Sequence, residues 1–566
     1  MAGPMYEAPT ESAVVDEAHL GDIRGAFGSL RWRQLWPART RRRRLAVLAA
    51  VMGPGLLALI ADNDAGGVAT YAQAGQERGL GLLWVLLPLG VVLFLNQEMA
   101  ARLGAVSGVG HARLIFERFG RLWGAFSLGD LLVLNLLTLL TEFIGVRIAA
   151  EHLGLPPAAA VAGSAAVLIV AALRGGFRRW ERVMYLLVAL DVALLPVLFL
   201  AQPAGHPGAA GVVSGGSALH SPVVLVVALL GTTVAPWQLF FQQSLVVDKR
   251  ITPRWMGYAR FDTALGTLLM LAGAAAVIVV SAAAFSGGPD AAARDVGGVL
   301  ATVGTRLGSS MGNVLALLLL DGAVLGAAAV TLATSYALGD VSGARHSLHR
   351  TPGEAPMFYA VTVGLVALAA GVVLVPSLPL GFTTTAVQVL AGLLLPGAAT
   401  FMLLLCNDTA VLGPWVNGRW HNAITAACIA GLLALSAMLV VTALFPAAPV
   451  RAVGTVLGGV AAAGLLGVAA GATAARRRVR RLLPQMAETA RLRVLSASEV
   501  VVMPRRPPRH IAEDLDRATW RTPPLAELRR PVWTRGRVIA MVALRGYVLA
   551  SLLLLAGRAV ASALGH

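Results

Sequence analysis

Charged residues are scarce in this chain of 566 residues. Asp, Glu, Lys and Arg together make up only 13% of it, whereas hydrophobic residues make up 57%. A soluble globular domain carries about 25% charged residues, so the composition excludes that class. The mean hydropathy of +0.73 instead indicates an integral membrane protein.

Motifs of enzymes and of disulfide-rich proteins are missing as well. The chain has no H-E-x-x-H pair and no G-x-S-x-G segment. Its two cysteines, Cys406 and Cys428, lie in or beside apolar stretches and give no disulfide framework. The first 44 residues lack the succession typical of a cleaved signal peptide. We therefore expect a membrane protein that is not an enzyme and carries no bound cofactor.

Acidic residues are outnumbered, with 29 Asp and Glu against 46 Lys and Arg, for a net charge of +17. The arginines form short blocks between apolar stretches, where they orient a chain in the membrane, so no nucleic-acid partner is expected. Every second connection is basic, beginning with Arg41 to Arg44. The positive-inside rule then predicts a multi-pass plasma-membrane protein whose N-terminus is cytoplasmic.

Apolar stretches long enough to cross a hydrocarbon core of about 30 Å recur along nearly the whole chain, and eleven or twelve spans are predicted. The basic tail after them suits either a solvated linker or a segment against anionic lipid headgroups. We expect an N-terminal cytoplasmic segment over 1–44 and two five-helix halves over 45–202 and 203–406. Two additional helices over 407–475, a basic cytoplasmic tail over 476–537 and a final spanning or interfacial helix over 538–566 should follow.

Polar residues interrupt the first span. Asp62, Asn63 and Asp64 are followed closely by Gly66 and Gly67 where a membrane helix should be uninterrupted hydrocarbon. A carboxylate at bilayer depth costs roughly 2.5 to 3.5 kcal/mol on insertion scales, so it is tolerated mainly where it faces a cavity or a cation. Non-helical backbone at that depth has the same implication. The break therefore predicts a cation site centred on Asp64, with Asp62 widening its aqueous surroundings.

A second break lies in the sixth span, where Thr232 to Gln238 contains Pro236. The two breaks are five spans apart, so they occupy corresponding places in two halves of opposite orientation. This pattern predicts an all-α membrane protein with a LeuT-like inverted repeat of two five-helix halves, broken helices 1 and 6, and additional C-terminal helices. The breaks should meet near the midplane, where freed carbonyls, helix ends and Asp64 favour a cation.

Several motifs resemble those of the Nramp family of divalent-metal transporters, over about residues 45 to 446. They are Gly53-Pro54-Gly55, Ala61 to Thr70, Leu83 to Leu87, Thr141 to Gly145, Leu394 to Pro396 and Cys406 to Asp408. The resemblance implies transport of a divalent metal ion. It also implies that Asp64 is the metal-binding aspartate, that Ala61 and Thr232 offer main-chain carbonyls, and that Gln388 lies near the site.

Two departures from the family pattern concern the cargo. Gly67 stands where the family has a ligand asparagine, and Ala235 stands where it has a methionine. Soft sulfur favours transition metals, whereas Mg²⁺ prefers oxygen and keeps bound water. Losing both side chains removes the sulfur and enlarges the pocket. The chain therefore resembles the magnesium-transporting branch of the family, with Mn²⁺ as the alternative cargo.

Proton coupling should be weak. Trp237 and Gln242 replace two family histidines in the sixth helix, and Leu139 replaces an aspartate, although Glu142 remains. All ten histidines lie outside the predicted spans or at their ends, so a histidine relay is hard to build. We expect uptake driven by the membrane potential, since about 100 mV supplies about 4.6 kcal/mol to a divalent ion.

Two other functions remain open on the same architecture. One is proton-coupled Mn²⁺ or Fe²⁺ transport. The other is amino-acid or amine transport, because broken helices also bind organic substrates through their dipoles. The candidate metal site consists of Asp64, Ala61, Gly67, Thr232, Ala235, Gln238 and Gln388, with Asp62, Asn63, Glu142, Trp237 and Gln242 as neighbours or ion-pathway residues.

Overall fold

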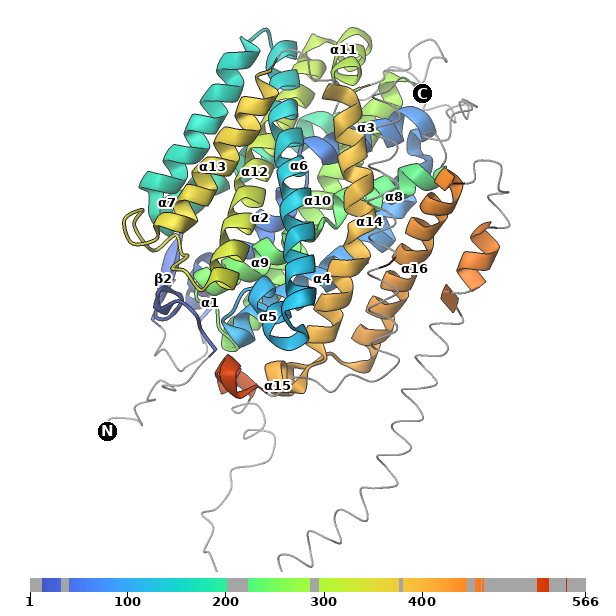
Figure 1. Cartoon of the computed structure of the whole chain (residues 1–566). Coiled ribbons are helices and arrows are strands. Elements are labelled where there is room, and N and C mark those ends of the chain that lie inside the picture. Colours follow the sequence, from blue (N-terminus) through green and yellow to red (C-terminus); the bar gives the residue numbers. More distant parts are fainter. Residues whose placement is uncertain are drawn as a thin grey trace, which may run out of the picture.

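A computed structural model describes residues 13–31, 40–200, 222–285, 295–375, 380–444, 453–459, 461–462, 517–528 and 546. Within these ranges the chain is almost entirely helical (Figure 1). The α-helices are α1 Arg41–Val51, α2 Pro54–Ile60, α3 Ala65–Arg78, α4 Leu86–Ser107, α5 His111–Phe119, α6 Arg121–His152, α7 Pro157–Leu200, α8 Pro222–Thr233, α9 Pro236–Asp248, α10 Met256–Ala284, α11 Val296–Arg306, α12 Ser309–Ser342, α13 Pro356–Val373, α14 Leu380–Cys406, α15 Thr409–Leu412 and α16 Arg419–Leu444.

Short elements complete the described part. The 3-10 helices are η1 Glu17–His19, η2 Gly79–Val85, η4 Pro253–Trp255, η6 Gly413–Trp415 and η7 Leu525–Glu527. Strands β1 Ile23–Gly25 and β2 Gly28–Leu30 form an antiparallel hairpin within the segment predicted as an N-terminal cytoplasmic arm. The hairpin, α5 and α11 are additions to the predicted pattern of spans.

Eight helical segments of the described residues are long and apolar enough to cross a membrane, or up to ten if each of two bent pairs is one span. This confirms the predicted all-α membrane fold. The predicted fourth and fifth spans join in α7, which kinks at Gly176 (φ 58°, ψ 164°). The kink is stabilised because the N–H of Phe177 donates to the carbonyl of Leu348 (3.0 Å). Most of the predicted twelfth span and all but residue 546 of the final helix lie outside the described residues.

The helices form one bundle whose two ends differ. Figure 1 shows α1, α5, α15 and β2 toward one end and α11 at the other. We call the first of these the basic end, because it carries Arg41 to Arg44 at the start of α1. The long helix α12 lies inside the bundle against α6, with 78% of its most apolar stretch buried. The broken helices pack beside these two, since α2 and α3 contact α10, and α9 contacts α4 and α12.

A further bend separates α1 from α2, by 53°. Gly53 takes φ +141°, and Asp262 of α10 accepts the N–H groups of Gly53 (3.0 Å), Gly55 (2.7 Å) and Leu56 (3.3 Å). The carbonyl of Met52 accepts from Lys249, which also pairs with a buried acid of α7, Glu181. Side chains of α7 and α10 therefore satisfy the backbone groups that the bend releases.

Part of the basic tail lies on the protein. The indole of Trp415 donates to the carbonyl of Arg517 (2.7 Å), and the Thr522 hydroxyl donates to the carbonyl of Val411 (2.8 Å). The side chain of Arg521 donates to the carbonyl of Ala105 (2.8 Å). The expected solvated linker is therefore wrong for residues 517–528, which lie on the protein, while contact of the basic tail with lipid headgroups stays a prediction. The reason for this packing is that carbonyls at the ends of α4 and α15 accept hydrogen bonds that the tail side chains would otherwise donate to water.

The bend at Gly53 yields a prediction about stability. A Cβ at this position would lie 2.3 Å from Oε1 of Glu181 and 2.9 Å from Nζ of Lys249, and φ +141° is strained for any L side chain. We expect Gly53→Ala to lower the free energy of unfolding by about 1 to 3 kcal/mol. Thermal unfolding in detergent measures this. Gly129→Ala on α6, where a Cβ meets open space, is the matched control and should leave the midpoint unchanged or raise it. Equal midpoints for the two variants would contradict the prediction.

Candidate functional site

The first break frees a main-chain carbonyl. Helix α2 ends at Ile60, and α3 begins at Ala65. In a continuous helix the N–H of Ala65 would donate to the carbonyl of Ala61. Here it donates to Oε2 of Glu142 on α6 (3.1 Å) instead. The carbonyl of Ala61, a residue with no exposed surface, is thus available to a ligand in the break.

Asp64 caps the second half of the broken helix. Its backbone is extended, and its Oδ1 accepts the N–H of Gly67 (2.6 Å). A carboxylate at this position satisfies an orphan donor and faces the positive end of the α3 dipole. Asp64 and Glu142 therefore both serve the backbone of the break. Gly326 of α12 packs against them, since a Cβ there would lie 2.9 Å from Cβ of Asp64 and 3.1 Å from the Glu142 carboxyl.

The second break frees a carbonyl in the same way. Helix α8 ends at Thr233 and α9 begins at Pro236. A continuous helix would bond the carbonyl of Thr232 to the N–H of residue 236, but proline has none. Ala235 is extended, and the N–H of Gln238 turns back to its carbonyl (3.2 Å). The carbonyl of Thr232 is therefore released at a buried position, as the sequence pattern predicts.

Side chains join the two breaks directly. The amide of Gln238 donates to Oδ1 of Asp62, and Gln97 of α4 donates to Oε1 of Gln238 (3.1 Å). Tyr71 of α3 and Thr233 of α8 bring their hydroxyl oxygens to 3.3 Å. The break residue that faces α9 is thus Asp62, while Asp64 faces α6 and α12. Sequence reasoning missed Gln97, although an amide pair, Asn96-Gln97, inside an apolar helix is a signal that could have found it.

Several buried oxygens at the breaks have no hydrogen-bond partner. They are Oδ2 of Asp62, Oδ1 of Asn63, Oε1 of Gln97, Oε1 of Glu142 and Oγ1 of Thr232. Each is costly to bury alone, and a hard cation could satisfy oxygens of this kind. Across the described residues, no three His, Cys, Asp or Glu side chains are placed to hold a metal ion by themselves. The donor set that fits a cation here is therefore one of mixed carboxylate, amide, hydroxyl and carbonyl oxygens.

The space beside Gly67 is filled. A Cβ on Gly67 would lie 2.5 Å from the carbonyl oxygen of Asp62 and 3.2 Å from the ring of Tyr71. Ala235 is buried as well, with 5% of its surface exposed. The expected enlargement of the pocket is therefore not seen at Gly67 in this conformation, because the backbone of the break and the Tyr71 ring close over Gly67.

The remaining predicted residues lie around the break. The amide of Asn63 packs against α10, where a Cβ on Gly273 would lie 2.3 Å from its nitrogen. Gln242 of α9 donates to the hydroxyl of Thr263 on α10 (2.9 Å). Gln388 belongs to α14, and its side chain lies outside the described residues.

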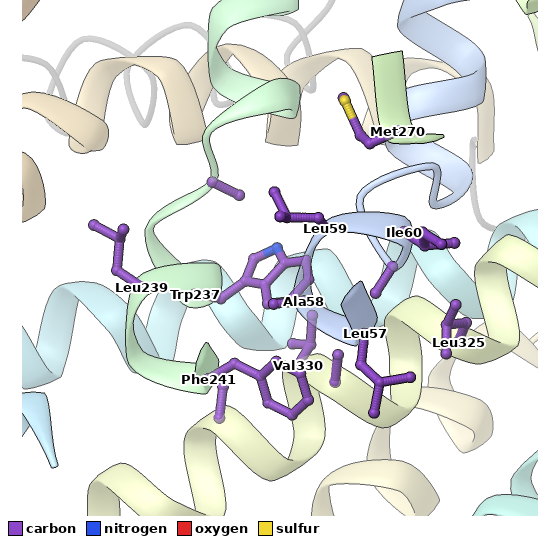
Figure 2. Close-up of a cluster of buried hydrophobic side chains, with 14 of the residues drawn as sticks. Leu57, Ala58, Leu59, Ile60, Trp237, Leu239, Phe241, Met270, Leu325 and Val330 are labelled. Atoms are coloured by element: carbon purple, nitrogen blue, oxygen red, sulfur yellow. The ribbon is translucent and has the colours of Figure 1, made fainter. Parts of the chain in front are cut away.

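Apolar side chains close the route from the breaks to the basic end. Figure 2 shows Trp237 of α9 among Leu57 and Ala58 of α2, Phe241 of α9 and Val330 of α12. All five are at most 1% exposed, and we call them the apolar plug. Helix α2 runs from the basic end to the first break, and α9 runs from the second break back to the basic end. The plug therefore seals the breaks from that end.

His111 lies between spans and contacts the second broken helix near its middle. His111 of α5 is fully buried, and its Nδ1 lies 3.0 Å from Oε1 of Gln243 on α9. Its ring meets that of Phe240 edge-on, with 4.7 Å between centroids. Burial lowers the pKa of His111 to about 4. This imidazole is therefore neutral near pH 7 and cannot exchange protons there.

Known proteins share the sequence pattern of this chain. Residues 55–442 match the family described as "Natural resistance-associated macrophage protein-like". A divalent metal cation transporter, MntH, of Ralstonia nicotianae is 27% identical over 401 residues, which are 68% of this chain and 88% of that protein. An MntH of Klebsiella pneumoniae is 27% identical over 410 residues, or 70% of this chain and 95% of that protein.

The architecture is also found in a solved structure. The manganese transporter of Eremococcus coleocola aligns with a TM-score of 0.58 at 19% identity, covering 77% of this chain and 95% of that one. At this level of identity the likeness concerns the fold alone. The fold described above is thus that of a known membrane-transporter architecture.

The filled space at Gly67 can be tested by adding one carbon. We expect Gly67→Ala to lower the free energy of unfolding by about 1 to 3 kcal/mol, because its Cβ must displace the Asp62 carbonyl. The midpoint of thermal unfolding in detergent measures the effect. Gly163→Ala on α7, where a Cβ meets nothing within 4 Å, is the matched control. A midpoint for Gly67→Ala no lower than that of the control would mean that the break has room for a side chain.

Proposed function

Because the chain belongs to the Nramp family, we propose that it is a plasma-membrane transporter that carries divalent metal cations by alternating access. The observation that carries this proposal is the pair of facing breaks. They release the carbonyls of Ala61 and Thr232, and they hold two buried acids, Asp62 toward α9 and Asp64 toward α6 and α12. Buried carboxylates and freed carbonyls at mid-bundle suit a cation far better than any apolar ligand.

The basic end is the cytoplasmic end in this proposal. Arg41 to Arg44, the basic residues of α5 and the arginines after α12 all lie in connections that the positive-inside rule assigns to the cytoplasm. The apolar plug then closes the cytoplasmic path. Release of the cation requires α2 and α9 to separate around Trp237, and the breaks supply the joints for this movement.

We favour Mg²⁺ as the cargo. The oxygens that lack a partner come from carboxylate, amide and hydroxyl groups, the ligand types preferred by hard cations. Ala235 offers no sulfur where the family has a methionine. The packed break must open before a hydrated ion can enter. In this proposal hydrated Mg²⁺ therefore binds in a conformation other than the plugged one. Mn²⁺ is the second candidate, because it accepts the same oxygen donors and because the relatives are named as divalent metal cation transporters.

Uptake in this proposal is driven by the membrane potential with weak proton coupling. Trp237 and Gln242 hold the positions of two family histidines, and neither titrates near neutrality. His111 contacts α9, but its pKa of about 4 keeps it neutral. Glu142 is engaged by the N–H of Ala65. The proton-coupled Mn²⁺ or Fe²⁺ mechanism is the competing outcome.

Cargo and coupling are measured together in liposomes that contain the purified full chain. An inside-negative potential is imposed, and internal Mg²⁺, Mn²⁺ and pH are followed with separate indicators. We expect potential-dependent Mg²⁺ entry without stoichiometric acidification. Mn²⁺ entry without Mg²⁺ would replace the proposed cargo, and acidification that follows metal entry would restore proton coupling. Uptake of amines or amino acids with no cation entry would overturn the proposal.

Charge and capping at Asp64 can be separated by one substitution. Asn is as good an N-cap as Asp, so Asp64→Asn should keep the fold while removing the charge. A hydrogen bond or contact to a charged group is worth about 1.5 to 3 kcal/mol, which predicts a loss of cation affinity of at least about tenfold. The measurement is the concentration dependence of uptake in the same liposomes.

A matched cap exists on α11, where Oδ1 of Asp295 accepts the N–H of Gly298 (2.8 Å). Asp295→Asn should therefore leave uptake unchanged. Asp62→Asn tests the carboxylate that faces Gln238, and we expect it to weaken uptake as well. Unchanged uptake in Asp64→Asn would assign that residue to capping alone and leave Asp62 as the carboxylate of the site.

A further inference from the structure

The described N-terminal segment, residues 13–31, lies across the basic end of the bundle. We call it the strap. Its hairpin sits on α1, since a Cβ on Gly25 would lie 2.4 Å from the carbonyl oxygen of Ala50 and one on Gly28 would lie 3.3 Å from the Cβ of Ala50. Strands β1 and β2 both contact α1, and β1 also contacts α7. The strap therefore covers the half-helix that leads to the hinge at Gly53 and on to α2.

The turn of the hairpin is attached to α7. The N–H of Ala26 donates to Oε2 of Glu181 (2.5 Å), and Arg182 donates to the carbonyl of Ala26 (3.1 Å). Glu181 is the same residue that pairs with Lys249 beside the α1–α2 bend. The hairpin and the bend therefore share one buried carboxylate.

The other end of the strap is fixed to the loop between α12 and α13. Asp16 is 4% exposed and accepts Arg350 through both of its oxygens (3.1 and 3.0 Å from Nε) and the N–H of His346 (3.0 Å). Nε2 of His19 lies 3.1 Å from the carbonyl oxygen of His346 and 3.6 Å from Asp248 at the end of α9. Two elements, α9 and the α12–α13 loop, thus converge on two strap residues, Asp16 and His19.

His346 carries a positive charge in this arrangement. Its Nδ1 lies 2.6 Å from the carbonyl oxygen of Ala344, and its Nε2 lies 3.0 Å from Oδ1 of Asp340. Both neighbours are acceptors, so both ring nitrogens must donate, as only the imidazolium can. Burial alone would lower the pKa of His346, but Asp340, the Ala344 carbonyl and Asp16 raise it to about 9.

We propose that the strap is a latch: by tying α1 to α7 and to the α12–α13 loop, it holds the cytoplasmic path of the transporter closed. The inference rests on the proposed function. Opening the apolar plug requires α1 and α2 to leave α9. Because the hairpin lies on α1 while Asp16 and His19 are held by α9 and the loop, that movement must break the strap contacts first. The latch thereby favours the state in which the breaks are sealed from the cytoplasm.

The charges around the latch fix its pH range. His346 faces Asp340 of α12 together with Asp16 and His19 of the strap, and Asp248 of α9 faces His19, His349 and Arg250. The raised pKa of His346 means that its contribution is present at neutral pH and is lost as pH rises through about 9. Burial lowers the pKa values of His19 and His349, so both stay neutral there and gain charge only in acid. The latch is therefore strengthened by His346 at cytoplasmic pH and weakened in alkali.

The test uses the full chain in liposomes, with Cys406→Ala and Cys428→Ala as the background and Ala58→Cys in the apolar plug as a reporter. We expect Asp16→Asn to speed modification of the introduced thiol by a permeant thiol reagent at least threefold. It should also speed amide hydrogen exchange of residues 23–30 at least fivefold. Glu17→Gln, an exposed neighbour in the same strap, is the matched control and should change neither rate.

The pH dependence supplies a second arm. With rates normalised to a free thiol at each pH, the background protein at pH 9.5 should match His346→Gln at pH 7.5. Faster exchange without faster thiol modification would overturn the latch, because the strap would then be attached without holding the path. Unchanged exchange in Asp16→Asn would also overturn it. Neither readout needs metal flux, so liposomes that show these changes but no cation entry would refute the proposed function and leave the latch standing.

Discussion

Backbone groups that are released inside a membrane bundle must find partners within the protein, and this constraint shapes the whole centre of the molecule. An unsatisfied peptide group in hydrocarbon costs several kcal/mol. Asp262 takes three N–H groups where α2 begins, Glu142 takes that of Ala65, and Asp64 takes that of Gly67. The helices can break only because carboxylates from α6, α10 and the break itself cap their ends.

The same carboxylates create the negative potential that a cation needs. An acid that caps a helix start also faces the positive end of its dipole, so it remains stable without a basic partner. Glycines let neighbouring backbones approach these acids. Gly145 of α6 and Gly322 of α12 allow their helices to touch Ala65 and Asn63, respectively. Close packing around the break explains why the plugged conformation leaves no open pocket beside Gly67.

The interpretation of the sequence succeeded where chemistry is local. Pro236 has no N–H, so the carbonyl of Thr232 is free wherever that helix lies. The family resemblance, based on short motifs, is confirmed over residues 55–442. The interpretation of the sequence failed where residues distant in the chain determine the packing. The side chain of Tyr71 and the Asp62 carbonyl occupy the space that Gly67 leaves. The amide pair Asn96-Gln97 is unusual in an apolar helix, but nothing local shows that Gln97 donates to Gln238 at the second break.

The sequence by itself determined that this is a multi-span membrane protein, that its first and sixth spans break, and that acids lie in the first break. Those properties follow from composition and from residues next to one another in the chain. Only the tertiary structure decided that Asp62 meets Gln238 while Asp64 caps α3, and that residues 13–31 and 517–528 lie on the basic end of the bundle. A hydrogen bond forms only when its partner comes to about 3 Å in the right direction, and no local pattern encodes which distant segment arrives there.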